Sequence, residues 1–169
     1  MIRVLLIDFA IIRDGIKQIL ADTGDLLVGG EAADGAEALR LLAQQGWDLV
    51  VLDIAILHSG GLELISRIRR ADPLLPILVF SMNREEHYAL RVLQAGASGF
   101  LTKESDSELL VAAMRKVAAG GVHVSDKVAK LLVHEYTRGT DKVAYVSWIS
   151  PLRATRIEAT AAGDRRHGV

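Results

Sequence analysis

The sequence lacks cysteine altogether, and it has only three prolines and few aromatic residues among its 169 positions. The absence of cysteine excludes disulfide bonds, thiolate metal sites and a cysteine nucleophile, and it suits a reducing compartment, so we expect a cytoplasmic location. No apolar run is as long as a membrane span. The strand-like run at the N-terminus is too short for a signal peptide. A net charge of −1 gives no reason to expect nucleic acid as a partner.

What the sequence does contain is a regular alternation of short apolar runs and segments with helical spacing. The apolar runs occupy residues 2–7, 26–30, 49–52, 77–80 and 99–101. They are short and nearly continuous, as is typical of strands buried on both faces. Between them, apolar residues recur at the spacing of amphipathic helices. Five such units predict an α/β domain with a parallel sheet and helices on both faces.

Several helix boundaries are marked by capping residues. Asp34, Asn83 and Ser105 each stand three residues before a glutamate, which is the pattern of an N-terminal cap. Glycines follow the helical runs at positions 24, 46, 96 and 120–121. Because glycine tolerates the backbone conformation that ends many helices, these positions predict helix stops.

The periodicity also predicts how the chain is divided. The α/β domain is expected over residues 1–121. Residues 122–138 are expected to form a helical extension or linker, with Val128, Leu131, Leu132 and Tyr136 on its apolar face. Residues 139–169 show no clear periodicity and no helix–turn–helix pattern, so we expect an irregular, poorly ordered tail without a DNA-binding domain.

Polar side chains follow four of the predicted strands. Asp8, Asp53, Ser81 and Lys103 stand at the carboxyl ends of these strands, which meet at one edge of a parallel sheet. A carboxylate can act as a nucleophile toward phosphorus. An ammonium group and a hydroxyl can compensate the charge of the transferred group, and two carboxylates suit Mg²⁺. The set therefore indicates a site that accepts a phosphoryl group.

These residues and their surroundings resemble the receiver domain of two-component response regulators, and within them the NarL/FixJ, or LuxR-type, transcription regulators. The matching stretches, which cover about residues 1–121, are IRVLLID, IIRDGIKQIL, GEAADGAEAL, DLVVLDI, GLELI, ILVFSM, EEHYALRVLQAGASGFLTKES and ELLVAAMRKVAAGG. The resemblance implies a flavodoxin-like (βα)5 fold with strand order 2-1-3-4-5.

The resemblance also implies roles for individual residues. Asp53 corresponds to the phosphoacceptor, and Ser81 and Lys103 correspond to the residues that stabilise the phosphoryl group. A Mg²⁺ ion is implied, held by Asp8, Asp53 and the backbone carbonyl of Ala55.

Two of these positions carry a further implication. Ser81 and Phe100 fall where the family has its switch hydroxyl and its switch aromatic residue.

The partners follow from the same resemblance. It implies a sensor histidine kinase as phosphoryl donor, transcription regulation as output, and no enzymatic activity beyond self-phosphorylation from a phosphodonor. A homodimer is expected through the face of the fourth helix, fifth strand and fifth helix, or through the first and fifth helices. We expect no specific DNA binding by this chain alone and no membrane association.

The chain departs from the family at the acidic pocket. Phe9 and Ala10 follow Asp8, where the family usually has a second acid and then histidine, and Leu57 and Gly60 replace the usual proline and aspartate of the next loop. With one acid fewer, Mg²⁺ should bind more weakly, and Lys103 could pair directly with the phosphoacceptor. We therefore expect impaired or phosphorylation-independent switching.

Three alternatives stay open from the sequence. The chain could be a protein-interaction or dimerisation module whose acidic pocket no longer accepts a phosphoryl group. It could be a phosphatase of the haloacid-dehalogenase type, although Asp53-Ile54-Ala55 offers no second acid two residues after the first. Finally, Asp8 and Asp53 could simply cap the helices that follow them.

Overall fold

The computed structural model describes residues 1–58, 60–84 and 86–138, and the predicted irregular tail at 139–169 lies outside these residues. A five-stranded parallel sheet with the order β2-β1-β3-β4-β5 forms its centre, which confirms the predicted order. The strands are β1 (Ile2–Ile7), β2 (Leu26–Ala32), β3 (Leu49–Leu52), β4 (Ile77–Ser81) and β5 (Gly99–Thr102).

Helices follow every strand. They are α1 (Ala10–Ala21), α2 (Gly35–Leu42), the 3-10 helix η1 (Ile54–Leu57), α3 (Gly61–Ala71), α4 (Glu86–Ala95), α5 (Ser107–Ala118) and α6 (Asp126–Thr137). The predicted cap at Asp34 is confirmed, because its carboxylate accepts the amide hydrogen of Glu37 at 2.8 Å. The predicted cap at Ser105 is wrong by one residue. Asp106 caps α5 instead, since its carboxylate reaches the Leu109 amide at 2.8 Å.

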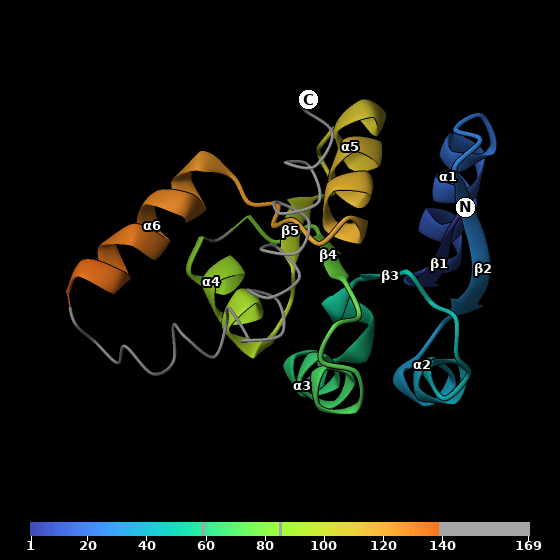
Figure 1. Cartoon of the computed structure of the whole chain (residues 1–169), viewed down its shortest axis with the longest axis horizontal. Coiled ribbons are helices and arrows are strands. Elements are labelled where there is room, and N and C mark those ends of the chain that lie inside the picture. Colours follow the sequence, from blue (N-terminus) through green and yellow to red (C-terminus); the bar gives the residue numbers. More distant parts are fainter. Residues whose placement is uncertain (59, 85, 139–169) are drawn as a thin grey trace, which may run out of the picture.

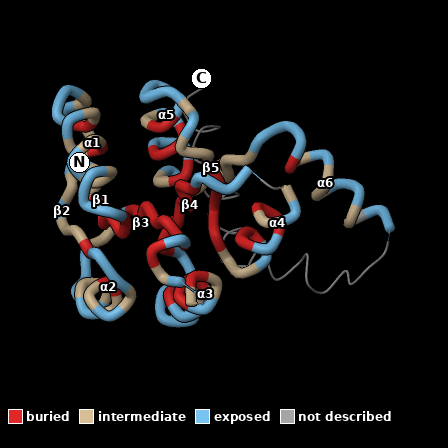
Figure 2. Tube along the Cα trace, turned by 180° about the vertical axis from the view of Figure 1, so that it is seen from behind, coloured by how far each residue is buried: buried red, intermediate tan, exposed pale blue. Residues whose placement is uncertain are grey.

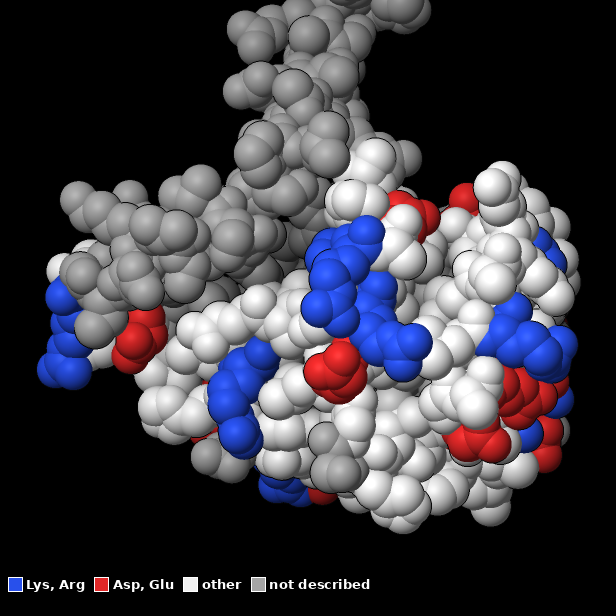
Figure 3. All heavy atoms as spheres, turned by 90° about the horizontal axis from the view of Figure 1, so that it is seen from below, with Lys and Arg blue, Asp and Glu red and all other residues white. Residues whose placement is uncertain are grey.

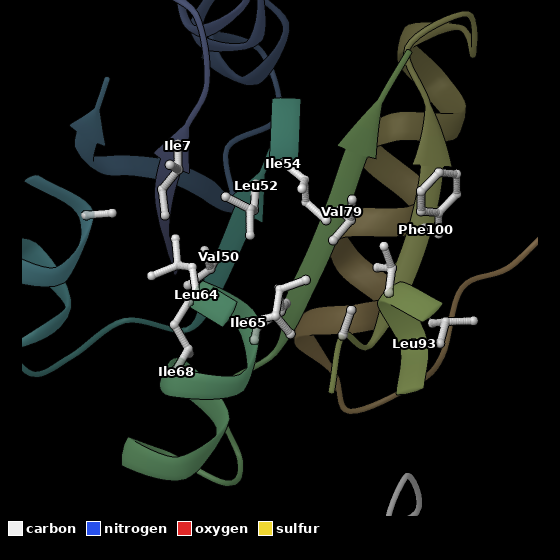
Figure 4. Packing of buried hydrophobic residues seen from close by; sticks show 14 of the residues in the cluster. Ile7, Val50, Leu52, Ile54, Leu64, Ile65, Ile68, Val79, Leu93 and Phe100 are labelled. Atoms are coloured by element: carbon white, nitrogen blue, oxygen red, sulfur yellow. The ribbon is translucent and has the colours of Figure 1, made fainter. Parts of the chain in front are cut away.

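The helices cover the sheet on both faces, as expected. Helices α1 and α5 lie on one face, and α2, α3 and α4 lie on the other (Figure 1). The central strands β3 and β4 are buried along their length (Figure 2). Figure 4 shows side chains of α3 and α4 meeting those of the sheet, with the Phe100 ring of β5 at the far side of this cluster. Burial on both faces explains why the strands are continuous apolar runs.

The outer edge of β5 is covered by the chain that follows α5. The Phe100 amide donates to the His123 carbonyl at 2.9 Å, and the His123 amide donates to the Ser98 carbonyl at 3.2 Å. The next helix, α6, packs against α4, and its Val128 belongs to the same buried cluster as Phe100. The segment predicted as a helical extension therefore lies against the domain in this structure.

The surface shows charges of both signs close together. On the face seen from below, Lys and Arg side chains lie beside Asp and Glu side chains (Figure 3). The ion pairs of the described residues include Arg40–Glu37 and Arg70–Glu63. Within the described residues, no helix combines the length and the apolar character needed to cross a membrane.

Candidate functional site

The sheet brings the four predicted strand-end residues to one edge. Asp8 directly follows β1, and Asp53 directly follows β3, its neighbour in the sheet. Ser81 is the last residue of β4, and Lys103 directly follows β5, the strand beside β4. Parallel pairing aligns these ends, since Ile7 lies opposite Leu52 and Ser81 lies opposite Thr102.

Lys103 joins the two carboxylates. Its Nζ lies 2.9 Å from Asp8 Oδ1 and 2.6 Å from Asp53 Oδ2. All three side chains are almost fully buried, with 1% of Asp8, 2% of Asp53 and 5% of Lys103 exposed. Charges that have left water need partners of opposite sign and good hydrogen-bond geometry. The single ammonium group contacts both carboxylates at once, so the cluster holds together without a metal but keeps one negative charge in excess.

The remaining carboxylate oxygens are satisfied unequally. Asp53 Oδ1 accepts the Ala55 amide at 2.8 Å, and Asp8 Oδ1 accepts the Phe9 amide at 2.7 Å. Asp8 Oδ2 is buried and accepts no hydrogen bond from any described residue. Burial raises the pKa of Asp8, and the nearby Lys103 opposes this rise only in part. The pocket therefore holds one buried oxygen that is free to take a cation or a hydrogen-bond donor.

Two aromatic rings lie beside the ammonium group. Lys103 Nζ is 5.9 Å from the centroid of Phe9 and 5.8 Å from that of Phe80, within the range of cation–π attraction. The Phe80 ring is buried in β4, whereas the Phe9 side of the pocket faces solvent, with 54% of that residue exposed. Sequence analysis considered Phe9 only as the replacement of a second acid, and it missed Phe80. The position of Phe80 directly before Ser81 was the available signal.

Ser81 and Phe100 are placed differently. Ser81 is buried, its hydroxyl accepts the Asn83 amide at 3.1 Å, and its carbonyl accepts the Lys103 amide at 2.8 Å. The Phe100 ring instead packs edge-on against Tyr88 of α4, with centroids 6.0 Å apart. Burial raises the pKa of Tyr88, and the charge of Asp53 adds to this rise. Tyr88 of α4 thus contacts Phe100 and also senses the charge of Asp53.

The donor set can be compared with what Mg²⁺ requires. This ion takes oxygen ligands, commonly one or two carboxylates with water completing its octahedron. Asp8 and Asp53 supply carboxylates, and the unpartnered Asp8 Oδ2 is suited to a cation. The Ala55 carbonyl accepts a long hydrogen bond from the His58 amide, at 3.4 Å. Among the described residues, no three His, Asp or Glu side chains gather as a metal-binding group. The residues therefore fit a Mg²⁺ ion that has few protein ligands.

Comparison with known proteins gives the same picture. Residues 4–115 match the family model described as the response regulator receiver domain. The chain is 34% identical over 135 residues to the transcriptional regulatory protein DegU of Brevibacillus brevis, which covers 80% of this chain and 57% of DegU. It is 35% identical over 133 residues to the response regulator GacA of Pseudomonas aeruginosa, covering 78% of this chain and 62% of GacA. The chain thus matches less than two thirds of these relatives.

Solved structures agree with the fold. A LuxR-family two-component response regulator from Aurantimonas sp. SI85-9A1 is 35% identical, with a TM-score of 0.70 and 80% of this chain and 96% of that chain covered. The isolated receiver domain of RcsB from Salmonella enterica serovar Typhimurium is 25% identical, with a TM-score of 0.71 and 79% and 99% covered. The family match spans more than half of the chain, and it includes all four strand-end residues. The chain belongs to the response regulator receiver domain family, and its relatives are LuxR/NarL-type response regulators.

Proposed function

We propose that this receiver domain is a signalling switch in which Asp53 accepts a phosphoryl group from a sensor histidine kinase. The observation that carries the proposal is the ion cluster at the strand ends. It supports the proposal because a cation lies 2.6 Å from Asp53 Oδ2, next to the proposed phosphoacceptor. Receiver domains are generally signalling domains rather than enzymes, and no catalytic activity beyond self-phosphorylation from a phosphodonor is proposed here.

The chemistry is a phosphoryl transfer between two side chains. An Asp53 carboxylate oxygen attacks the phosphorus of a phosphohistidine and forms an acyl phosphate. The phosphorus–nitrogen bond breaks, and the released imidazole nitrogen keeps the electron pair and takes a proton. Lys103 compensates negative charge on the transferred group, and the Ser81 hydroxyl donates to one of its oxygens, because charge spreads over three phosphoryl oxygens.

A Mg²⁺ ion is part of the proposal. Asp8, Asp53 and the Ala55 carbonyl would hold it, and it would neutralise charge on the phosphoryl oxygens. In the metal-free cluster, Lys103 already contacts both carboxylates and compensates one of their two negative charges. A metal therefore has to compete with an ammonium group that contacts both of its ligands. This competition supports weak metal binding and an atypical, slower response to phosphodonors.

The proposal is tested by following backbone amides in NMR spectra of the full chain. Mg²⁺ is added first, and beryllofluoride, which stands in for the phosphoryl group on an aspartate, is added second. We expect shifts at Asp53, Ser81 and Lys103 that are absent from Asp53→Asn. Unchanged spectra at millimolar Mg²⁺ with beryllofluoride would refute phosphoryl acceptance at this site.

A second candidate is a protein-interaction module that works without phosphorylation. The same ion cluster favours it, because a buried lysine bound to both carboxylates holds the domain in one state without any ligand. This candidate expects the unchanged chain to bind its partners equally well with and without a phosphodonor. It is refuted if binding of a partner depends on beryllofluoride.

Transcription regulation is the proposed output. DegU carries this activity in its name, and the part of DegU matched here is 57% of its length. We propose that the described domain supplies the regulatory half of such an activity and does not itself bind DNA specifically. Homodimerisation, through α4–β5–α5 or through α1 and α5, belongs to the same proposal.

A further inference from the structure

Among the side chains of α6 that the structure describes, few hold the helix to the domain. Val128 is the one that is strongly buried, with 3% exposed, while Leu132 and the preceding Val124 are partly buried against the same cluster. An ion pair between Lys127 and Glu86 adds a long contact of 3.9 Å at the surface. By contrast, α5 buries Leu110, Ala113, Met114 and Val117. Since apolar burial is the main source of tertiary stability, α6 is held more weakly than α5.

The surface under α6 is formed by α4 and the edge of β5. Val128 shares its buried cluster with Val92 and Leu93 of α4 and with Phe100 of β5. Phe100 also contacts Tyr88 of α4. In Figure 1, α6 lies beyond α4 on the β5 side of the sheet. Helix α6 therefore occupies a surface to which both α4 and the last strand contribute.

Strand β5 connects this surface directly to the ion cluster. Lys103 follows β5 and contacts both carboxylates. Three residues earlier, the Phe100 amide donates to the His123 carbonyl, and the cap of α6, Ser125, stands two residues after His123. A short, hydrogen-bonded strand moves largely as a unit. A change in the position of Lys103 thus acts on the hydrogen bond to His123, just before the start of α6, and on the contact of Phe100 with Tyr88 of α4.

We propose that the surface of α4 and the β5 edge is a docking site that α6 binds reversibly. Occupation of the Asp53 site by a phosphoryl group releases α6, and the released helix signals this occupation to binding partners. The docking of α6 is argued from the burial of Val128 in the cluster that contains Phe100, without any reference to Asp53. The coupling part rests on the proposed function, because it requires a ligand at Asp53.

The docking part is tested by hydrogen exchange on the full chain without any phosphodonor. Val128→Ala removes the buried anchor. Val133→Ala is the matched control, because it makes the same change in the same helix at a residue that is 63% exposed. We expect Val128→Ala to speed exchange of the α6 amides by about tenfold and to leave α1 to α5 unchanged. Equal effects of the two variants, or a loss of protection throughout the domain, would overturn the docking part.

The coupling part is tested by adding Mg²⁺ and beryllofluoride to the unchanged chain and to Asp53→Asn. We expect faster exchange in α6 only where Asp53 is present. If amides at Asp53 and Lys103 shift while exchange in α6 stays the same, the coupling is wrong and the proposed function stands. If no amide at the ion cluster shifts, the proposed function fails, and the Val128→Ala result alone decides the docking part.

Discussion

Among single residues, Phe9 has an unusual position, because its ring lies beside a buried ammonium group at the mouth of the pocket. A cation–π contact at a partly exposed site contributes about 0.5–1 kcal/mol, or roughly two- to fivefold in an equilibrium. We expect Phe9→Ala to weaken the hold on Lys103 and to lower the Mg²⁺ concentration for half-maximal shift of the Asp53 amide by about this factor. Phe9→Leu keeps apolar bulk without a ring. If Leu preserves the wild-type value, bulk rather than the ring is responsible.

Asp8 sets a pH dependence of stability. Its pKa is raised above the ordinary value of 3.8, mainly by burial. A raised pKa in the folded state means that the stability from this group is fully present below 3.8 and is lost as pH rises through the folded value. We therefore expect the free energy of unfolding of the wild type, relative to Asp8→Asn, to be lowest near neutral pH and to increase on acidification. Urea unfolding at several pH values measures this difference, and a difference that does not vary with pH would contradict the assignment.

The positions of the site residues were predictable because parallel strands end at a common edge, which placed Asp8, Asp53, Ser81 and Lys103 together. Their contacts were less accessible. The Lys103–Asp8 pair joins residues 95 positions apart. The distance between Nζ and Oδ1 depends on the conformations of the two loops that carry these residues. The contact of Lys103 with the Phe9 ring depends on a side-chain direction that no periodicity encodes. The family resemblance pointed to the altered pocket, but only the structure shows what fills it.

Among the secondary-structure elements, β5 depends on close packing at Gly99. A Cβ at this position would lie 2.9 Å from the His123 carbonyl oxygen and 3.1 Å from side-chain atoms of Leu78 and Val117. We expect Gly99→Ala to lower the free energy of unfolding by about 1–3 kcal/mol, because backbone atoms must move to admit the methyl group.

The control for Gly99 is Gly15, which lies inside α1 with open space around its missing Cβ. Gly15→Ala should raise stability by roughly 0.5–1 kcal/mol, since alanine loses less backbone entropy in a helix. Urea unfolding of both variants measures the two effects, and equal changes would show that crowding at β5 is not the cause.

Element boundaries were predictable to different degrees. The five strands were found within two residues of their ends, because continuous apolar runs have clear limits. The start of α5 was misplaced, since Ser105 and Asp106 are both capable caps and only the geometry of the turn selects the carboxylate. Helix α6 was expected from its periodicity, but its packing on α4 was not. An amphipathic pattern shows which face of a helix is apolar, but not which part of the domain that face packs against.

Considered as a whole molecule, the domain has two expected faces for self-association, and α6 covers the α4–β5 part of one of them. We expect Val128→Ala to raise the association constant of the chain about tenfold over Val133→Ala, because it increases the population in which this face is uncovered. Sedimentation at several protein concentrations measures the constant. If both variants associate like the wild type, the face of α1 and α5 is the one in use.

The chain segment around His123 has a consequence for solubility. An edge strand with unpaired amides and carbonyls invites strands of other molecules, and such pairing leads to aggregation. Here the His123 carbonyl accepts the Phe100 amide hydrogen, and the His123 amide donates to the Ser98 carbonyl. At the opposite edge, the pairing of β2 with β1 shifts register between Val4 and Leu5, and such irregularities disfavour further strand addition. Residues after α5 thus protect the sheet, and variants that detach them should precipitate more readily on storage.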